Sequence, residues 1–495
     1  MQLPPITYII LYGHCPNIRS YAGFALNAVN SDSKHFFIIE VEIIKVNKQI
    51  YQKIMRKVAF HNLGCKVNSY ETDIMRKNLL SNGYSVVPFD QKADVYVVNT
   101  CSVTNIADRK SRQLLHRAKK LNPNAVIVAA GCYVDTRSKN SVLEEGVDIA
   151  VLNSEKEELF HILDAYFDKK GSEAEKCGED LFQREIIGEG HLSGDVHLHT
   201  RAFIKCQDGC NMFCTYCIIP YARGRIKSRN IRDICEEVRR LSSEEGFKEF
   251  VLTGIHICSY GIDRKEEGET LAELIRAVSE TEGVERIRLS SLEPKAVDEG
   301  FISKISGIDK LCPHFHMSLQ SGSDTVLKRM NRHYDTEDFK SRVLALREAF
   351  FDPAITTDII VGFPGESEEE FEETVRFVED IGFYETHIFK YSRRKGTPAD
   401  RMDGQLTEKV KAERSSRLLL MNNENKRRFI DRHMKKESEL LLEEELSIGS
   451  NKYLTGYTGE YIKAAVEAGD FESGQIIKGY PDGFIDDETV LFIPE

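Results

Sequence analysis

Three closely spaced cysteines, Cys210, Cys214 and Cys217, constrain this chain more than any other feature of its sequence. They follow a predicted strand at Arg201–Cys206, so they lie on a loop at the carboxyl end of that strand. Zinc requires four ligands in a closed tetrahedron, and a cubane iron–sulfur cluster is usually held by four cysteines. The next cysteine, Cys235, falls inside a predicted helix and offers no fourth ligand. The spacing therefore predicts an iron–sulfur cluster with one open iron. A zinc site and three free, buried cysteines remain the alternatives.

The composition is that of a globular protein with several domains. At 495 residues the chain is too long for a single ordinary core. No apolar run approaches the roughly 20 residues that span a bilayer, so we expect a cytoplasmic protein with no membrane partner. Its twelve cysteines are then metal ligands or free thiols rather than disulfides. The net charge of −12 means that any RNA site must be a local basic patch on an acidic body.

Residues 1–54 form a poorly patterned extension, whereas a strong strand begins at Lys57–Phe60, just after Met55. One hypothesis is that Met55 is the native start and that residues 1–54 come from upstream sequence. The alternative is a genuine, loosely ordered extension, because chain termini are often disordered.

Residues 55–160 alternate short β-rich runs with helical stretches, which predicts an N-terminal domain built on an open parallel α/β sheet. Three of its strands run directly into Cys65, Cys101 and Cys132, which are 36 and 31 positions apart. The carboxyl ends of parallel strands line one edge of a sheet, so these three thiols are expected to converge. This predicts a second three-thiolate site. The alternative is that each cysteine is a small core residue.

A polar, glycine-rich linker is expected at residues 161–198, and the alternation of strands and helices resumes at residues 199–430. Six strands with intervening helices predict a partial (βα)6 barrel, whose active site gathers at the carboxyl ends of the strands. The Cys210–Cys217 loop lies at that rim. Other residues at strand ends are candidates for the same rim, although turns alone would explain them: Thr253, Gly254, Gln320 and Gly362.

Residues 431–495 contain short β-like runs separated by glycines, which predicts a small antiparallel β-barrel. Lys426, Arg427 and Arg428 belong to a basic stretch just before it. This stretch is either a phosphate-binding surface or a solvated helix face. Residues 437–495 carry three lysines, no arginine and fourteen acids, so the barrel itself should bind phosphates weakly.

Taken in order, the motifs resemble the methylthiotransferase family of radical S-adenosylmethionine enzymes. The match runs from Lys57 to Glu495. The motifs that carry it are Leu63–Asn68, Asn99–Val103, Gly131-Cys132, Cys210–Pro220, Arg223-Gly224-Arg225, Ser290–Pro294, Leu319–Ser323, Met330-Asn331-Arg332, Val361–Glu366 and Gly396-Thr397-Pro398. The resemblance implies an N-terminal domain with an auxiliary cluster, a central radical barrel and a C-terminal TRAM barrel that binds RNA.

The resemblance also assigns the two cysteine sets. Cys210, Cys214 and Cys217 would hold the 4Fe-4S cluster that cleaves S-adenosylmethionine and generates the radical. The set Cys65, Cys101 and Cys132 would hold an auxiliary 4Fe-4S cluster that carries the sulfur to be transferred. The rim residues at positions 253, 254, 320 and 362 would then bind S-adenosylmethionine. A reductant protein such as flavodoxin or ferredoxin would supply the electron.

Within the family, the Leu63–Asn68 motif resembles the branch that acts on N6-threonylcarbamoyladenosine at position 37 of tRNA, next to the anticodon. The runner-up is the branch that acts on N6-isopentenyladenosine at the same position, and a third branch modifies an aspartate of a ribosomal protein. An iron–sulfur electron-transfer protein is the non-enzymatic alternative, but it would need four thiolates for each cluster.

Overall fold

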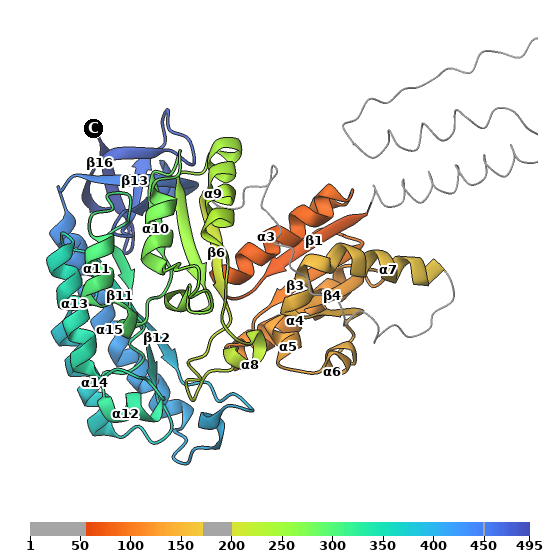
Figure 1. Cartoon of the computed structure of the whole chain (residues 1–495), viewed down its shortest axis with the longest axis horizontal. Coiled ribbons are helices and arrows are strands. Elements are labelled where there is room, and N and C mark those ends of the chain that lie inside the picture. The colour runs from red at the N-terminus through yellow and green to blue at the C-terminus, as the bar shows by residue number, and fades with distance from the viewer. Residues whose placement is uncertain (1–55, 172–199, 449–450) are drawn as a thin grey trace, which may run out of the picture. The chain divides into compact units, whose positions relative to one another are not determined.

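The computed structural model describes residues 56–171, 200–448 and 451–495. Residues 1–54 and the greater part of the expected linker at 161–198 lie outside the described residues. Contacts join Lys57–Glu495 into one unit, and Figure 1 labels many of its helices and strands. No helix in the described part of the chain is both long and apolar enough to cross a membrane.

The expected parallel sheet is present, with strand order β2-β1-β3-β4-β5. Its central strands, β3 (Val95–Thr100) and β4 (Val126–Gly131), are completely buried, as is typical of a parallel sheet covered on both faces. The remaining strands are β1 (Lys57–Asn62), β2 (Ser85–Val87) and β5 (Ile149–Val151). One face packs against α3 (Lys66–Ser81) and α7 (Leu159–Gly171), and the other packs against α4 (Asn105–Leu121), α5 (Cys132–Asp135) and α6 (Lys139–Leu143).

The expected partial barrel is also present. Its parallel strands follow the order β6-β8-β9 and β10-β11-β12, and isolated bridges from Ile287 to Leu311 and from Leu292 to Met317 join the two sheets. The strands are β6 (Arg201–Asp208), β8 (Glu249–Gly254), β9 (Arg286–Leu289), β10 (His314–His316), β11 (Ala354–Val361) and β12 (Glu385–Lys390). A short strand that the sequence pattern did not predict, β7 (Lys227–Ser228), pairs antiparallel with β6.

Helices cover the outer face of these strands. Side chains alternate along each strand, so every second residue packs into the core beneath the helices. Phe315 on β10 and Ile359 on β11 are such residues, and both are fully buried. The covering helices are α9 (Ile231–Glu245), α10 (Leu271–Ser279), α11 (Glu299–Ile305), α13 (Thr336–Ala349) and α14 (Glu368–Ile381). The intervening positions face the opposite side, which we call the inner face.

A closed five-stranded barrel follows the single long helix α15 (Glu408–His433). Its strands are β13 (Ser438–Ile448), β14 (Asn451–Thr458), β15 (Lys463–Glu467), β16 (Ile476–Phe484) and β17 (Val490–Pro494). The sequence pattern predicted antiparallel pairing throughout, but β15 and β17 pair in parallel. The reason is geometric, because strand direction cannot alternate around a closed ring with an odd number of strands.

The turn between β14 and β15 covers the amino ends of the (βα)6 strands. Arg201 donates a hydrogen bond to the Tyr461 hydroxyl at 3.2 Å. The same phenol ring stacks on His314 with ring centroids 4.8 Å apart, and the Arg288 guanidinium lies 4.7 Å from its centroid. Arg288 also donates to the Thr458 carbonyl oxygen at 3.1 Å. The small barrel therefore closes one end of the larger one.

Candidate functional site

The Cys210–Cys217 loop starts at a glycine that no other residue can replace. Gly209 has a φ of +69°, and a Cβ built there would lie 1.9 Å from the Arg225 carbonyl oxygen. The Cys210 N–H donates to the Gly224 carbonyl oxygen at 3.1 Å, and Phe213 adopts a φ of +49°. This tight path places the thiols of the loop within electrostatic range of one another.

The segment around Asn331 forms hydrogen bonds with the Cys210–Cys217 loop. The Thr215 N–H donates to the Met330 carbonyl oxygen at 3.0 Å. The Asn331 side-chain amide donates to the Phe213 carbonyl oxygen at 3.2 Å. A third segment contributes as well, because the Ala399 N–H donates to the Thr215 carbonyl oxygen at 2.8 Å. Residues far apart in sequence therefore fix the conformation of the cysteine loop.

Arg332 brings a positive charge to this loop. Its Nη1 donates to Cys214 Sγ at 3.2 Å, and its Nη2 donates to Glu293 Oε2 at 2.5 Å. Burial alone would raise the pKa of Glu293, but His256 and Arg332 hold it below its usual value. Arg332 therefore places a buried cation, paired with Glu293, against a sulfur of this loop.

The second set of cysteines comes from three strand ends. Cys65 follows β1, Cys101 follows β3, and Cys132 follows β4 directly. Gly64 has a φ of +111°, and a Cβ built there would lie 3.1 Å from Cys101 Sγ, so glycine permits this close approach. Both Cys65 and Cys132 act electrostatically on the Cys101 thiol, and the Asn153 amide donates to Cys132 Sγ at 3.6 Å. The fold thus brings the three thiols together. Cys65 is exposed, whereas Cys101 and Cys132 are buried.

A buried charge cluster lies between the two cysteine sets. Glu71 on α3 accepts hydrogen bonds from Arg223 Nη1 at 2.8 Å, from Lys205 Nζ at 2.8 Å and from Lys156 Nζ at 2.5 Å. Burial alone would raise the pKa of Glu71, but the three cations hold it well below its usual value. Arg223 follows the Cys210–Cys217 loop on α8 (Ile219–Arg223), and its charge also acts on Cys65. The cluster therefore links the two sites.

The two thiol sets suit a cluster better than a single ion. Burial, with a smaller contribution from the neighbouring thiols, raises the pKa of Cys101 to about 11 and that of Cys217 to about 12, so these thiols need a metal to ionise. In the described parts of the chain, neither cysteine set has its ligand atoms all within 4.8 Å of one another. Two sulfurs on one zinc ion lie roughly 4 Å apart. The wider spacing leaves room for a cubane.

Comparison with known proteins agrees with this geometry. Residues 204–378 match the Radical SAM superfamily, and residues 57–152 match the Uncharacterized protein family UPF0004. The threonylcarbamoyladenosine tRNA methylthiotransferase MtaB of Bacillus subtilis is 40% identical over 436 residues, which cover 86% of this chain and 95% of that protein. The tRNA-2-methylthio-N(6)-dimethylallyladenosine synthase of Clostridium tetani is 37% identical and covers 80% of this chain and 87% of its own length.

This chain belongs to the radical S-adenosylmethionine methylthiotransferase family. It is therefore a transferase, and its family implies S-adenosylmethionine and a 4Fe-4S cluster as cofactors. Its fold resembles that of the radical S-adenosylmethionine methyltransferase TsrM from Kitasatospora setae, with a TM-score of 0.52 and 16% identity over 70% of this chain and 77% of that one. Because the chain belongs to this enzyme family, the alternative of an iron–sulfur electron-transfer protein no longer applies.

The residues expected to bind S-adenosylmethionine in this methylthiotransferase all lie near the carboxyl ends of barrel strands. Thr253 is buried at the end of β8, and a Cβ at Gly254 would lie 2.8 Å from Gln207 Oε1. Gln320 has a φ of +75°, and its N–H donates to the Asp358 carbonyl oxygen at 2.8 Å. At Gly362, a Cβ would lie 2.4 Å from Lys411 Cγ. These contacts account for the glycines through packing, so their cofactor role stays a prediction.

The residues expected to bind RNA are already engaged with acids. Lys426 pairs with Glu385 at 3.2 Å and is largely covered. Arg427 lies 3.5 Å from Asp431, Arg428 lies 3.4 Å from Glu424, and both arginine side chains are more than half exposed. Exposed pairs of this kind contribute only about 0.3–0.5 kcal/mol, so phosphates can displace them. The two arginines stay candidates, whereas Lys426 is turned toward β12.

Sequence reasoning did not place four of the residues described above at the cysteine sites: Glu71, Arg223, Glu293 and Arg332. Arg223 was expected in a stretch, Arg223–Arg229, that could bind RNA. Three of the four lie in motifs that carry the family resemblance, namely Arg223–Arg225, Ser290–Pro294 and Met330–Arg332. Their contacts with the cysteine sites join segments that are far apart in sequence, and spacing alone does not reveal such contacts. Glu71 had no comparable signal.

Proposed function

We propose that this enzyme transfers a methylthio group to C2 of N6-threonylcarbamoyladenosine at position 37 of tRNA and uses two 4Fe-4S clusters. The observation that carries the proposal is the pair of three-thiol sites, each without a fourth cysteine ligand among the described residues and joined by the Glu71–Arg223 ion pair. Cys210, Cys214 and Cys217 would hold the radical cluster, and Cys65, Cys101 and Cys132 would hold the auxiliary one.

When bound, the first cluster and S-adenosylmethionine supply the means to remove an unreactive hydrogen, and the second cluster supplies the sulfur. The chain's own residues keep the two sites in place. Arg332 holds Cys214 with a charged hydrogen bond, which is stronger than a neutral one. Arg223 joins α8, directly after the first cysteine loop, to α3, directly after Cys65. Thr253, Gly254, Gln320 and Gly362 form the rim at which S-adenosylmethionine would bind.

The names of the relatives support the choice of substrate. The proteins from Bacillus subtilis, Aquifex aeolicus and Thermotoga maritima are 40%, 39% and 36% identical, and all are named for threonylcarbamoyladenosine. The second candidate is the dimethylallyl (isopentenyl) substrate, because synthases named for it are 34–37% identical. Both candidates place the reaction at an adenosine of tRNA.

The proposed reaction also sets the partners. The target position lies beside the anticodon, so the enzyme must bind the anticodon stem-loop, and Arg427 and Arg428 would contact its phosphates. One-electron reduction of the radical cluster requires a reductant such as flavodoxin or ferredoxin. We place the enzyme in the cytoplasm, where its tRNA substrate is found.

The test is mass spectrometry of tRNA nucleosides from a strain that lacks this gene, compared with the parent strain and with a strain in which the gene is restored. We expect 2-methylthio-N6-threonylcarbamoyladenosine to disappear and to return on complementation. Loss of 2-methylthio-N6-isopentenyladenosine instead would transfer the proposal to the second candidate.

A further inference from the structure

The inner face of the barrel differs from the packed interior of a typical (βα)8 barrel, where branched apolar side chains fill the centre. Here the positions that alternate with the buried core residues are mainly polar or charged, including Arg201, Glu249, Arg288, His314, Thr356 and Glu385. Several inner-face residues of β11 and β12 are accessible to solvent, although the outer face of β11 is buried. An accessible polar face of this kind is suited to a polar ligand.

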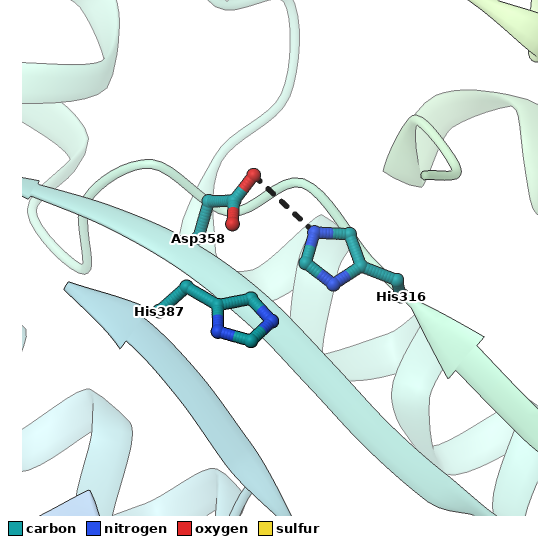
Figure 2. Close-up of side chains that lie close together, drawn as sticks. All are labelled: His316, Asp358 and His387. Carbon is teal, nitrogen blue, oxygen red and sulfur yellow. Dashed lines mark ion pairs between the residues drawn. The ribbon is translucent and has the colours of Figure 1, made fainter. Parts of the chain in front are cut away.

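Three inner-face side chains form a compact group that the radical chemistry leaves unused. His316 on β10, Asp358 on β11 and His387 on β12 point toward one another, as Figure 2 shows. One ligand atom from each lies within 4.8 Å of the others. The His316 Nε2 lies 3.3 Å from Asp358 Oδ2, and the two imidazole rings are stacked with centroids 5.6 Å apart.

Thr356 fixes the orientation of His316. The Thr356 hydroxyl lies 3.0 Å from His316 Nδ1 and 3.1 Å from His314 Nε2. The opposite ring nitrogen of His316, Nε2, is buried and faces Asp358 Oδ2 without forming a well-aligned hydrogen bond among the described residues. His387 is exposed, and Asp358 is partly exposed. A bound molecule can therefore reach a donor on His387 and an acceptor on Asp358.

An exposed aromatic residue lies next to the group. Phe389 is 47% exposed and is two positions beyond His387 on β12, so both side chains project from the inner face. Residues two apart on a strand are separated by roughly 7 Å. Phe389 lies toward the carboxyl end of the strand, on the side of the active-site rim. Aromatic side chains stack on unpaired bases of RNA, and the separation suits a purine on Phe389 with its N6 group at His387.

We propose that His316, Asp358 and His387 form the binding site for the polar substituent on N6 of the target adenosine, with the base stacked on Phe389. This inference rests on the proposed function. The imidazole N–H groups donate hydrogen bonds to the substituent's carboxylate, and Asp358 accepts from its hydroxyl and amide groups. A dimethylallyl group offers none of these hydrogen-bond partners. It would leave polar atoms of the site unpaired, which lowers its affinity for the site.

The experiment compares full-length, cluster-reconstituted enzyme with the variants His387→Leu and Asp358→Asn. Each protein is assayed with tRNA bearing either threonylcarbamoyladenosine or isopentenyladenosine at position 37. We expect both variants to raise KM or lower kcat/KM for the threonylcarbamoyl substrate roughly 10- to 100-fold and to lose discrimination between the two tRNAs. His161→Leu, which removes an exposed histidine on α7, is the matched control and should behave as wild type.

The outcomes separate the inference from the function on which it rests. A wild-type enzyme that modifies only the isopentenyl substrate overturns the proposed function. A wild-type enzyme that modifies the threonylcarbamoyl substrate, with unchanged KM, kcat and discrimination in both variants, overturns this inference alone. One zinc ion bound per chain by the wild type and lost in His316→Ala would show that the group is a metal site, which also overturns it.

Discussion

The two cysteine sites of this enzyme each present three thiols, but the chain supplies them in two different ways. The Cys210–Cys217 loop supplies its thiols from eight consecutive residues, and hydrogen bonds from Asn331 and Arg332 hold the loop in shape. The Cys65, Cys101 and Cys132 site takes one thiol from each of three strand ends, and the parallel sheet itself holds them together. The geometry of the first site therefore depends on one loop, and that of the second depends on the whole parallel sheet.

Because of this difference, different substitutions should disrupt the geometry of the two sites. A loop site can lose its geometry when a single supporting side chain is removed, while the remaining fold stays intact. A site built from strand ends loses its geometry only when the sheet unfolds or when the ion pairs packed beside it are broken. Glu71 and Arg223 form one such ion pair and connect the two sites.

Removing one cysteine from each site should separate the two functions completely. We expect Cys214→Ala to abolish both 5′-deoxyadenosine formation and methylthiolated product, because the radical cluster loses a ligand. We expect Cys101→Ala to form 5′-deoxyadenosine but no methylthiolated tRNA. Both products are quantified by mass spectrometry. Cys235→Ala on α9 is the control and should retain both activities. Equal losses in the two cysteine variants would mean that the sites are not separable.

Removing the central carboxylate should cost more stability than removing any surface acid. Glu71→Gln leaves Lys156 without its partner and leaves Arg223 and Lys205 with Asp208 alone, and breaking a buried charge cluster costs about 3–5 kcal/mol. Chemical denaturation measures this loss. Glu413→Gln breaks an exposed pair with Lys409 and should cost under about 1 kcal/mol. Equal costs for the two variants would show that the buried cluster contributes nothing special.

The same carboxylate should make the wild-type protein sensitive to acid. The pKa of Glu71 in the folded state lies well below the usual value of 4.5. The stabilisation is therefore complete above pH 4.5 and is lost as the pH falls further toward the folded-state pKa. We expect the stability difference between wild type and Glu71→Gln to shrink below pH 4.5 in denaturation curves. A difference that does not change with pH in that range would contradict the ionised state of Glu71.

Removing Arg332 should impair the Cys210–Cys217 site without affecting the other cysteine site. Arg332→Met removes the hydrogen bond to Cys214 and leaves Glu293 without that cation. Supporting partners of metal ligands typically contribute 10- to 100-fold, so we expect 5′-deoxyadenosine formation to fall by roughly that factor. Iron bound at the auxiliary site, measured in a Cys214→Ala background, should not change. Arg393→Met, which removes an exposed cation, serves as the matched control.

Charge on α15 should affect binding to tRNA but neither cluster. Arg427→Ala combined with Arg428→Ala should weaken tRNA binding and flatten its salt dependence by up to roughly two units of slope, because each phosphate contact contributes about 0.9. Filter binding at several salt concentrations measures both quantities. Unchanged affinity and slope would remove these two arginines from the RNA surface.

Sequence reasoning predicted the elements more accurately than the contacts between them. The strands that end at Cys65, Cys101 and Cys132 were expected from their alternation with helices, and the structure places them in adjacent parallel positions, with β1 beside β3 and β3 beside β4. The small barrel was expected to be antiparallel throughout. An odd number of strands forced β15 and β17 to pair in parallel, and no local pattern reports the closure of a ring.

The sequence by itself determined the two three-cysteine sets, the parallel sheet and the partial barrel, because ligand spacing and strand periodicity are local properties of the chain. Only the tertiary structure decided that Glu71 lies against Arg223, that Arg332 reaches Cys214, and that three inner-face side chains meet at His316. These contacts join residues tens to hundreds of positions apart. Their energies depend on burial and orientation, which arise only when the strands and helices have packed.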